Sequence, residues 1–76
     1  MVIKPQDIRL KEVLFEMKQV GHYLRITAID PVSGTEVISI GDPSVDPELL
    51  KRMATRKLKY VIAKNRNQRA ATSNEY

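Results

Sequence analysis

The side chains that could carry out catalysis are few in this sequence and are spread along it. His22 is the only histidine, there is no cysteine, and the serines are Ser33, Ser39, Ser44 and Ser73. A serine nucleophile needs a base within hydrogen-bond reach, and none of these serines has the sequence context of a nucleophile elbow. His22 follows a glycine in a predicted tight turn, where a surface residue is the simpler interpretation. We therefore expect no catalytic residues and a protein that is not an enzyme.

Two aspartates flank a strand that the sequence predicts at residues 36–40. Asp30 and Asp42 stand at its opposite ends, too far apart to act as an acid–base pair. Both positions suit a turn, because an aspartate carboxylate bonds backbone N–H groups that follow it. The glycines are isolated and do not have the spacing of a phosphate-binding loop. The common structural zinc sites use cysteine ligands, and the sequence has no cysteine. The sequence predicts no metal and no cofactor.

Basic residues are concentrated in the second part of the chain. Residues 47–76 hold eight lysines and arginines against two acids, whereas residues 1–46 hold five against seven, and the net charge is +4. At about 100° per residue, Arg52, Arg56 and Lys59 fall on one side of a helix. Together with three further cations of the helix, they could neutralise the phosphates of a nucleic acid: Lys51, Arg52, Arg56, Lys59, Lys64 and Arg66.

The same charges have a simpler interpretation, which is a solvated helix face. Lysine and arginine are good helix formers and suit the negative C-terminal end of the helix dipole. The sequence has no nucleic-acid-binding motif, no second helix for a helix-turn-helix and no aromatic platform for stacking. We favour the solvated face and keep nucleic-acid binding as the second hypothesis.

Alternating apolar residues predict three strands, at residues 13–20, 23–30 and 36–40. A glycine begins a two-residue turn between the first two strands, and the sequence DPVSGT at residues 30–35 forms the second turn. We set the register by pairing Val20 with Tyr23 and Asp30 with Thr35. One face of the sheet then collects Phe15, Met17, Leu24, Ile26 and Ala28, with Val37 beside Ala28. The short connections favour an antiparallel meander.

A C-terminal helix is predicted to follow. Asp46 is a favourable N-cap, Pro47 suits the first helical position and Glu48 lies at the positive end of the dipole. The apolar stripe of the helix can cover one face of the sheet: Leu50, Met53, Ala54, Leu58, Val61 and Ile62.

The predicted fold class is α+β, a three-stranded antiparallel β-meander with one C-terminal α-helix packed on one face (β-β-β-α). Residues 11–65 form this single domain. We expect residues 1–10 to be a loose N-terminal arm and residues 66–76 to be a disordered polar tail.

The second face of the sheet is also apolar. One helix leaves six residues uncovered there: Leu14, Val20, Tyr23, Ile29, Ile38 and Ile40. Contiguous apolar patches are rare on monomers, and a second copy can cover the patch through a two-fold interface. Alternatively, Glu16, Lys18, Arg25 and Thr27 interrupt this face, and their aliphatic stems, together with the N-terminal arm, hide enough of it. We favour a homodimer, because 76 residues without a disulfide form only a small core.

No long apolar run is present. The stretch MVIKPQDIRL is too interrupted for a signal-peptide core, and nothing approaches the ~20 apolar residues of a membrane span. We expect a soluble, cytoplasmic protein with no membrane partner.

The run TAIDPVSGTEVISIGDP at residues 27–43, followed by RKLKYVIAK at residues 56–64, resembles a small bacterial domain family of unknown function, found chiefly in proteobacteria. The resemblance covers about residues 12–64. It implies a short intracellular domain with no assigned reaction, and it carries over no functional residues. It agrees with a turn role for Asp30, Pro31, Gly34, Gly41 and Pro43. The function that we expect is a small non-enzymatic interaction module of unknown biological role.

Overall fold

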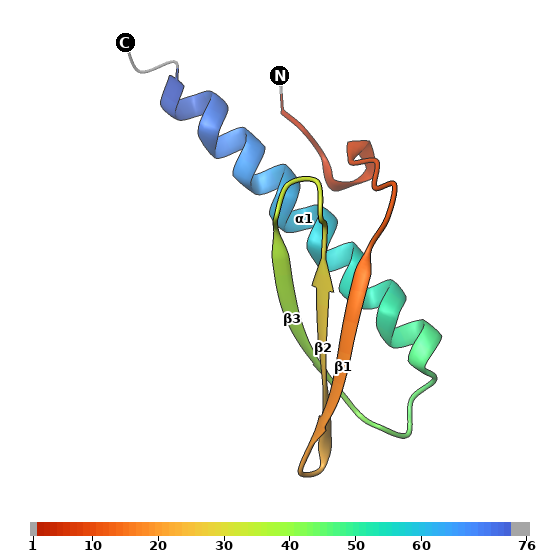
Figure 1. The fold of residues 1–76 in the computed structure, drawn as a ribbon. Coiled ribbons are helices and arrows are strands. Elements are labelled where there is room, and N and C mark those ends of the chain that lie inside the picture. The colour runs from red at the N-terminus through yellow and green to blue at the C-terminus, as the bar shows by residue number, and fades with distance from the viewer. Residues whose placement is uncertain (1, 74–76) are drawn as a thin grey trace.

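Three antiparallel strands and one long helix form the fold (Figure 1). The computed structural model describes residues 2–73, and the side chains of residues 2–70. A short 3₁₀ turn, η1 (Pro5–Asp7), is followed by β1 (Leu14–Val20), β2 (Tyr23–Ile29), β3 (Glu36–Gly41) and α1 (Pro47–Ser73). The strand order is β1-β2-β3, and α1 lies along one face of the sheet. The predicted α+β fold and its β-meander are confirmed.

The register of the sheet is the predicted one. The paired residues include Val20 with Tyr23, Met17 with Ile26 and Ala28 with Val37. Gly21, in the two-residue turn between β1 and β2, has a φ of +59°. Glycine adopts this left-handed conformation without steric cost. With this register, successive side chains of each strand alternate between the helix side and the opposite side of the sheet.

Asp30 organises the turn between β2 and β3. It is 4% exposed, and its carboxylate accepts hydrogen bonds from the Ser33 hydroxyl at 2.6 Å and from the N–H groups of Val32 and Ser33, both at 3.2 Å. The Ser33 hydroxyl lowers the pKa of Asp30 most, burial opposes it, and the backbone bonds and the charge of Arg66 add to the lowering. Gly34 has a φ of +75° and donates its N–H to the Asp30 carbonyl at 2.9 Å. The predicted turn role of Asp30 is confirmed.

Asp46 caps α1 as predicted. Its Oδ1 accepts the N–H of Glu48 at 3.0 Å, and its carbonyl accepts the N–H groups of Leu49 and Leu50 at 3.0 and 3.2 Å. The side-chain bond satisfies one of the first donors of the helix, which have no partner within it. The local sequence at Asp46 therefore determines where α1, the helix that covers the sheet, begins.

The helix continues beyond the predicted end of the domain. Residues 66–73, which we expected to belong to a disordered tail, form the last turns of α1, and residues 74–76 lie outside the described residues. The polar side chain of Asn67 has a specific partner here. Its Oδ1 accepts the N–H of Ile3 and its Nδ2 donates to the Ile3 carbonyl, both at 2.9 Å. We expected this polar stretch to be a disordered tail, whereas in the structure Asn67 hydrogen-bonds to the backbone of the N-terminal segment.

The N-terminal segment packs against the helix, which differs from the loose arm expected for residues 1–10. Ile8 is 1% exposed and belongs to the core, and η1 contacts α1. The Asp7 carboxylate accepts the N–H of Lys4 at 3.0 Å and closes η1. A single buried residue in a stretch of mixed charge has no period, so the sequence pattern did not reveal it. Residue 1 lies outside the described residues.

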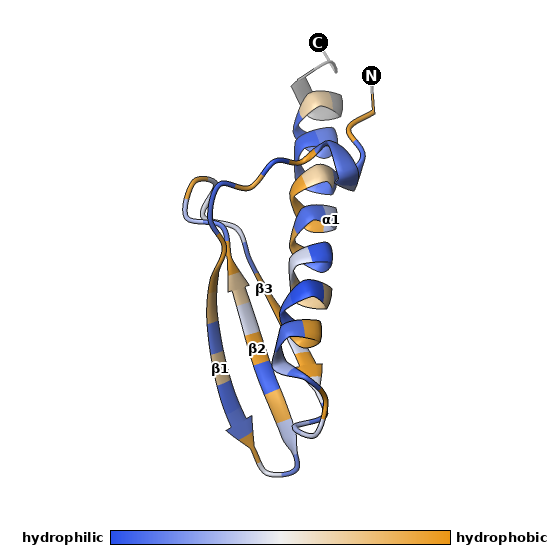
Figure 2. Cartoon of the chain, turned by 90° about the vertical axis from the view of Figure 1, so that its right-hand side faces the viewer, coloured by the Kyte–Doolittle hydropathy of each residue, from blue (hydrophilic) through white to orange (hydrophobic). Residues whose placement is uncertain are grey.

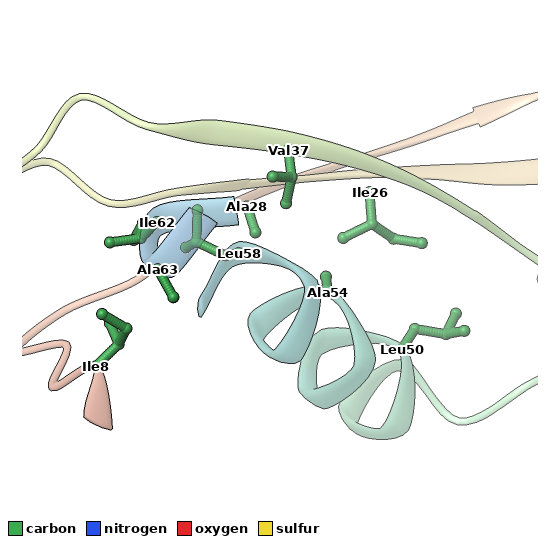
Figure 3. Packing of buried hydrophobic residues seen from close by; sticks show 9 residues of the cluster. All are labelled: Ile8, Ile26, Ala28, Val37, Leu50, Ala54, Leu58, Ile62 and Ala63. Atoms are coloured by element: carbon green, nitrogen blue, oxygen red, sulfur yellow. The ribbon is translucent and has the colours of Figure 1, made fainter. Parts of the chain in front are cut away.

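The core lies between α1 and the helix side of β2 and β3 (Figure 3). Its buried members are Ile8, Ile26, Ala28, Val37, Leu50, Ala54, Leu58, Ile62 and Ala63. Ala28, Ala54 and Leu58 are all 0% exposed. The two alanines allow a close approach of the helix to the middle strand, where interiors are densely packed.

Several predicted core residues lie at its margin. The helix runs diagonally across the sheet, and its main contacts are with β2, β3 and η1 (Figure 1). Phe15, Met17 and Leu24 are therefore only partly buried, although they lie on the predicted face. Met53, which we placed in the apolar stripe, is 54% exposed. Ile26 and Ala28 are buried as predicted.

Gly41 ends β3 close to the first turn of α1. A Cβ atom at this position would lie 2.8 Å from Cδ2 of Leu50 and 3.4 Å from Cδ1 of Ile26. We predicted Gly41 as a turn residue after the strand, whereas it is the last residue of β3. Its missing side chain makes room for Leu50 against the sheet.

Candidate interaction surfaces

One face of the sheet has no helix over it. Figure 2 shows α1 on one side of the strands, and none of the described elements lies across the other side. We call that side the outer sheet face, and its residues are Leu14, Glu16, Lys18, Val20, Tyr23, Arg25, Thr27, Ile29, Glu36, Ile38 and Ile40. Its exposed large apolar residues are Leu14 at 45%, Tyr23 at 41%, Ile38 at 43% and Ile40 at 61%.

The six residues predicted for a dimer face all lie on the outer sheet face, but their exposure differs. Val20 and Ile29 are half-buried, whereas the other four are exposed. Thr27, in the centre, is only 9% exposed although no described element covers it. A hollow of about 150 Å³ beside it is lined by Glu16, Lys18, Arg25 and Thr27. Long charged side chains therefore shield the middle of β1 and β2, in line with part of the alternative interpretation, and leave the two isoleucines of β3 and the apolar residues Leu14 and Tyr23 near the two ends of the face exposed.

A second surface follows α1 on the side of the N-terminal segment. An open groove with a volume of about 710 Å³ is lined by Pro5, Gln6, Arg52, Met53, Thr55, Arg56, Lys57, Lys59 and Tyr60. We call it the basic groove. It brings together Arg52, Arg56 and Lys59, which are three of the six predicted nucleic-acid contacts. A neighbouring hollow of about 350 Å³ shares Pro5 and Tyr60 and reaches a fourth, Lys64.

The two remaining predicted contacts, Lys51 and Arg66, line neither of these hollows. Lys51 Nζ lies 3.4 Å from the Glu48 carboxylate and 5.7 Å from the centre of the Phe15 ring. The positive charge of Arg66 helps to lower the pKa of Asp30. The six cations therefore do not form one continuous site.

Lys57 protects the free edge of β3. Its ammonium group donates to the carbonyl of Ile38. The Asp30 N–H donates to the Thr35 carbonyl. Hydrogen-bonded and non-hydrogen-bonded pairs alternate along an antiparallel ladder. Since Asp30 and Thr35 form a hydrogen-bonded pair, the pair that contains Ile38, three positions along, is a non-hydrogen-bonded one, and the backbone N–H and C=O of Ile38 point away from β2. A lysine at a sheet edge opposes the addition of another strand. Association through this edge is therefore disfavoured, in contrast to the open outer sheet face.

Sequence reasoning missed the aromatic residue of the basic groove. Tyr60 is 57% exposed and lines the groove together with Arg56 and Lys59. Its position gave a signal, because residues four apart on a helix are neighbours. Tyr60 stands four residues after Arg56 and four before Lys64. The low aromatic content of the whole chain obscured this local coincidence.

Of the polar residues considered for catalysis, Asp30 and Ser33 pair within one turn and Asp42 and Ser44 within another, whereas Ser39 lies in β3 and Ser73 ends α1. His22 is exposed in the turn between β1 and β2. Asp42 accepts the N–H of Ser44 at 2.9 Å and its hydroxyl at 2.8 Å, and the backbone bond lowers the pKa of Asp42 most. The turn role predicted for Asp42 is confirmed.

Residues 2–73 contain no group of three or more histidine, aspartate or glutamate residues placed to hold a metal ion. Over the same residues, no helix combines the length and the apolar character needed to span a bilayer.

The fold defines the class of the protein as a small α+β domain, in which a β-meander carries one long helix on one face. Residues 10–65 match a family described as a domain of unknown function (DUF6898), and the chain belongs to this family. The match spans β1 to β3 and most of α1, close to residues 12–64, over which the sequence resembles such a family. No curated protein and no solved structure matches the chain.

Proposed function

We propose that this protein is a small non-enzymatic interaction module that associates with a second copy of itself through the outer sheet face. One observation carries the proposal. Leu14, Tyr23, Ile38 and Ile40 are between 41% and 61% exposed on a single face. Monomeric proteins rarely leave such a group contiguous and open to water. A two-fold interface covers the same patch on both copies at once.

The size of the face sets the expected strength of this association. Three strands of about seven residues present a surface of about 14 Å by 23 Å. Its area of about 320 Å² per copy is well below the ~800 Å² per partner of a standard interface, which places the contact among weak and transient associations. We therefore expect a reversible dimer with a dissociation constant in the micromolar range rather than an obligate one.

Sedimentation velocity over a range of micromolar concentrations tests the proposal. The wild-type protein should change from monomer to dimer as its concentration rises. Ile40→Lys places a charge in the apolar patch and should leave a folded monomer. Val32→Lys is the matched control, because Val32 is 82% exposed in the turn outside the patch. A wild-type protein that stays monomeric at high micromolar concentration contradicts the proposal.

Nucleic-acid binding in the basic groove is the second candidate, and the position of Tyr60 favours it. An exposed aromatic ring beside Arg56 and Lys59 offers a base-stacking surface next to phosphate-binding cations. Arg52→Gln with Arg56→Gln should abolish binding to a short single strand. Arg9→Gln with Lys11→Gln removes the same charge from exposed positions outside the groove and should preserve binding. The absence of binding by the wild-type protein at low salt rejects this candidate.

A further inference from the structure

The residues of the outer sheet face form four rows across the strands. The rows, from one end of the sheet to the other, are Leu14, Ile29 and Glu36, then Glu16, Thr27 and Ile38, then Lys18, Arg25 and Ile40, and finally Val20 and Tyr23. The two central rows have the same layout with opposite charge. In each of them β1 contributes a charged residue and β3 contributes an isoleucine.

When the strands of the two copies run nearly aligned, as is common for packed sheets, a two-fold axis that stacks two such faces lies either parallel or perpendicular to the strands. An axis parallel to the strands places β1 of one copy over β3 of the other. Glu16 then meets the partner's Ile38, and Lys18 meets the partner's Ile40. Glu16 and Lys18 then gain no partner of opposite charge, and Arg25 faces the partner's Arg25, a juxtaposition of like charges that disfavours this arrangement.

An axis perpendicular to the strands keeps each strand over the same strand of the other copy and exchanges the rows. Glu16 then faces the partner's Lys18, with the partner's Arg25 in the adjacent strand. Ile38 faces the partner's Ile40. The outermost rows exchange in the same way, so that Leu14 meets the partner's Val20. Charge meets opposite charge along β1, and apolar meets apolar along β3 and in the outermost rows, whereas Arg25 of the middle strand faces the partner's Thr27.

We propose that the outer sheet face binds a second copy about a two-fold axis perpendicular to the strands, with Glu16 of each copy paired to the partner's Lys18 and Arg25. This inference rests on the proposed self-association and adds its register. β1 is an edge strand, so the charge pair lies at the rim of the interface, where such pairs select the partner and the orientation more than they add affinity. The β3 isoleucines form the apolar side of the contact.

Charge reversal tests the register. Glu16→Lys places three cations together and should raise the dimer dissociation constant by about tenfold or more. Lys18→Glu should have a smaller effect, because the partner's Arg25 still faces Glu16. The double variant Glu16→Lys with Lys18→Glu restores one opposite pair and should recover most of the affinity lost in Glu16→Lys. Glu12→Lys, which makes the same change in net charge at an exposed position outside the face, should leave the affinity unchanged.

Cysteine cross-linking distinguishes this register from pairing of two β1 edges, which would also bring Glu16 close to the partner's Lys18. The natural sequence has no cysteine. A mixture of Ile38→Cys and Ile40→Cys should form the mixed disulfide in preference to either homodimer, since only the face-to-face register apposes these positions. Absence of this cross-link in a dimeric protein, or a charge swap without recovery, overturns the register alone. A monomeric wild-type protein overturns self-association itself.

Discussion

The two faces of the sheet have similar sequences and different environments. On the helix side, Ile26, Ala28 and Val37 are 1%, 0% and 6% exposed, whereas on the outer side Ile38 and Ile40 are 43% and 61% exposed. Both groups alternate along the same strands, so apolar character alone does not decide which is buried. Burial depends on whether another element crosses the face. The helix supplies that cover on one side, and the described residues supply none on the other.

The largest expected effect separates the two faces directly. Leu58→Ala removes a fully buried side chain and should cost about 2–5 kcal/mol of unfolding free energy, which includes the cavity left behind. Ile40→Ala should change the stability of the monomer by no more than about 0.5 kcal/mol, as at other exposed positions. Urea unfolding at a concentration where the chain is monomeric measures both. Equal losses would mean that the outer face is covered within one copy.

A smaller effect is expected where the helix side is most tightly packed. Gly41→Val introduces a Cβ atom next to Leu50 and should cost about 1–3 kcal/mol through overpacking. The same substitution in a Leu50→Ala background should cost less, because the conflicting side chain is gone. A double-mutant cycle of urea unfolding measures this coupling. If the losses of unfolding free energy are additive, the contact between the new side chain and Leu50 is not the cause of the destabilisation.

The N-cap of the covering helix should contribute still less. Asp46→Ala removes the bond to Glu48 N–H and should cost about 0.5–2 kcal/mol. Faster amide exchange at Glu48, Leu49 and Leu50 should accompany the loss. Asp42→Ala is the control, since the Asp42 carboxylate bonds Ser44 within its own turn, and its loss should leave exchange in α1 unchanged. Uniform acceleration over the whole domain would contradict a local capping role.

The smallest effect is a dependence of the unfolding free energy on pH, which arises from Asp30 in the turn between β2 and β3. The pKa of Asp30 is lowered from its ordinary value of 3.8 in the folded protein. A depressed pKa means that the stabilisation by ionised Asp30 is complete above the ordinary value and is lost as the pH falls through the folded pKa. Asp30→Asn should therefore weaken the protein at neutral pH and flatten the loss of stability below about pH 4. Identical acid profiles for the two proteins would exclude this role.

The parts of the fold that the sequence predicts well depend on neighbouring residues. The register follows from Val20 and Tyr23 flanking a two-residue turn, and the helix start follows from Asp46. The outer sheet face also follows, because alternation assigns each strand residue to a side. These signals act within a few residues, so no knowledge of distant segments was needed.

The parts that the sequence did not predict depend on distant segments. Ile8 is buried and Asn67 is bonded only because the two ends of the domain lie side by side (Figure 1). Met53 is exposed because the helix crosses the sheet diagonally, which periodicity along α1 cannot specify. In the same way, the partner of Lys51 on β1 was not visible from the charge pattern of the helix.

The pair between Ile3 and Asn67 has a consequence for the order in which the domain assembles during translation. A chain emerges from the ribosome from its N-terminus. The backbone groups of Ile3 can therefore bond the Asn67 side chain only after 64 further residues have been synthesised. The β1–β2 hairpin can close much earlier, since its turn is local. Until α1 emerges, the N-terminal segment and both faces of the newly formed sheet remain accessible to chaperones and to neighbouring nascent chains.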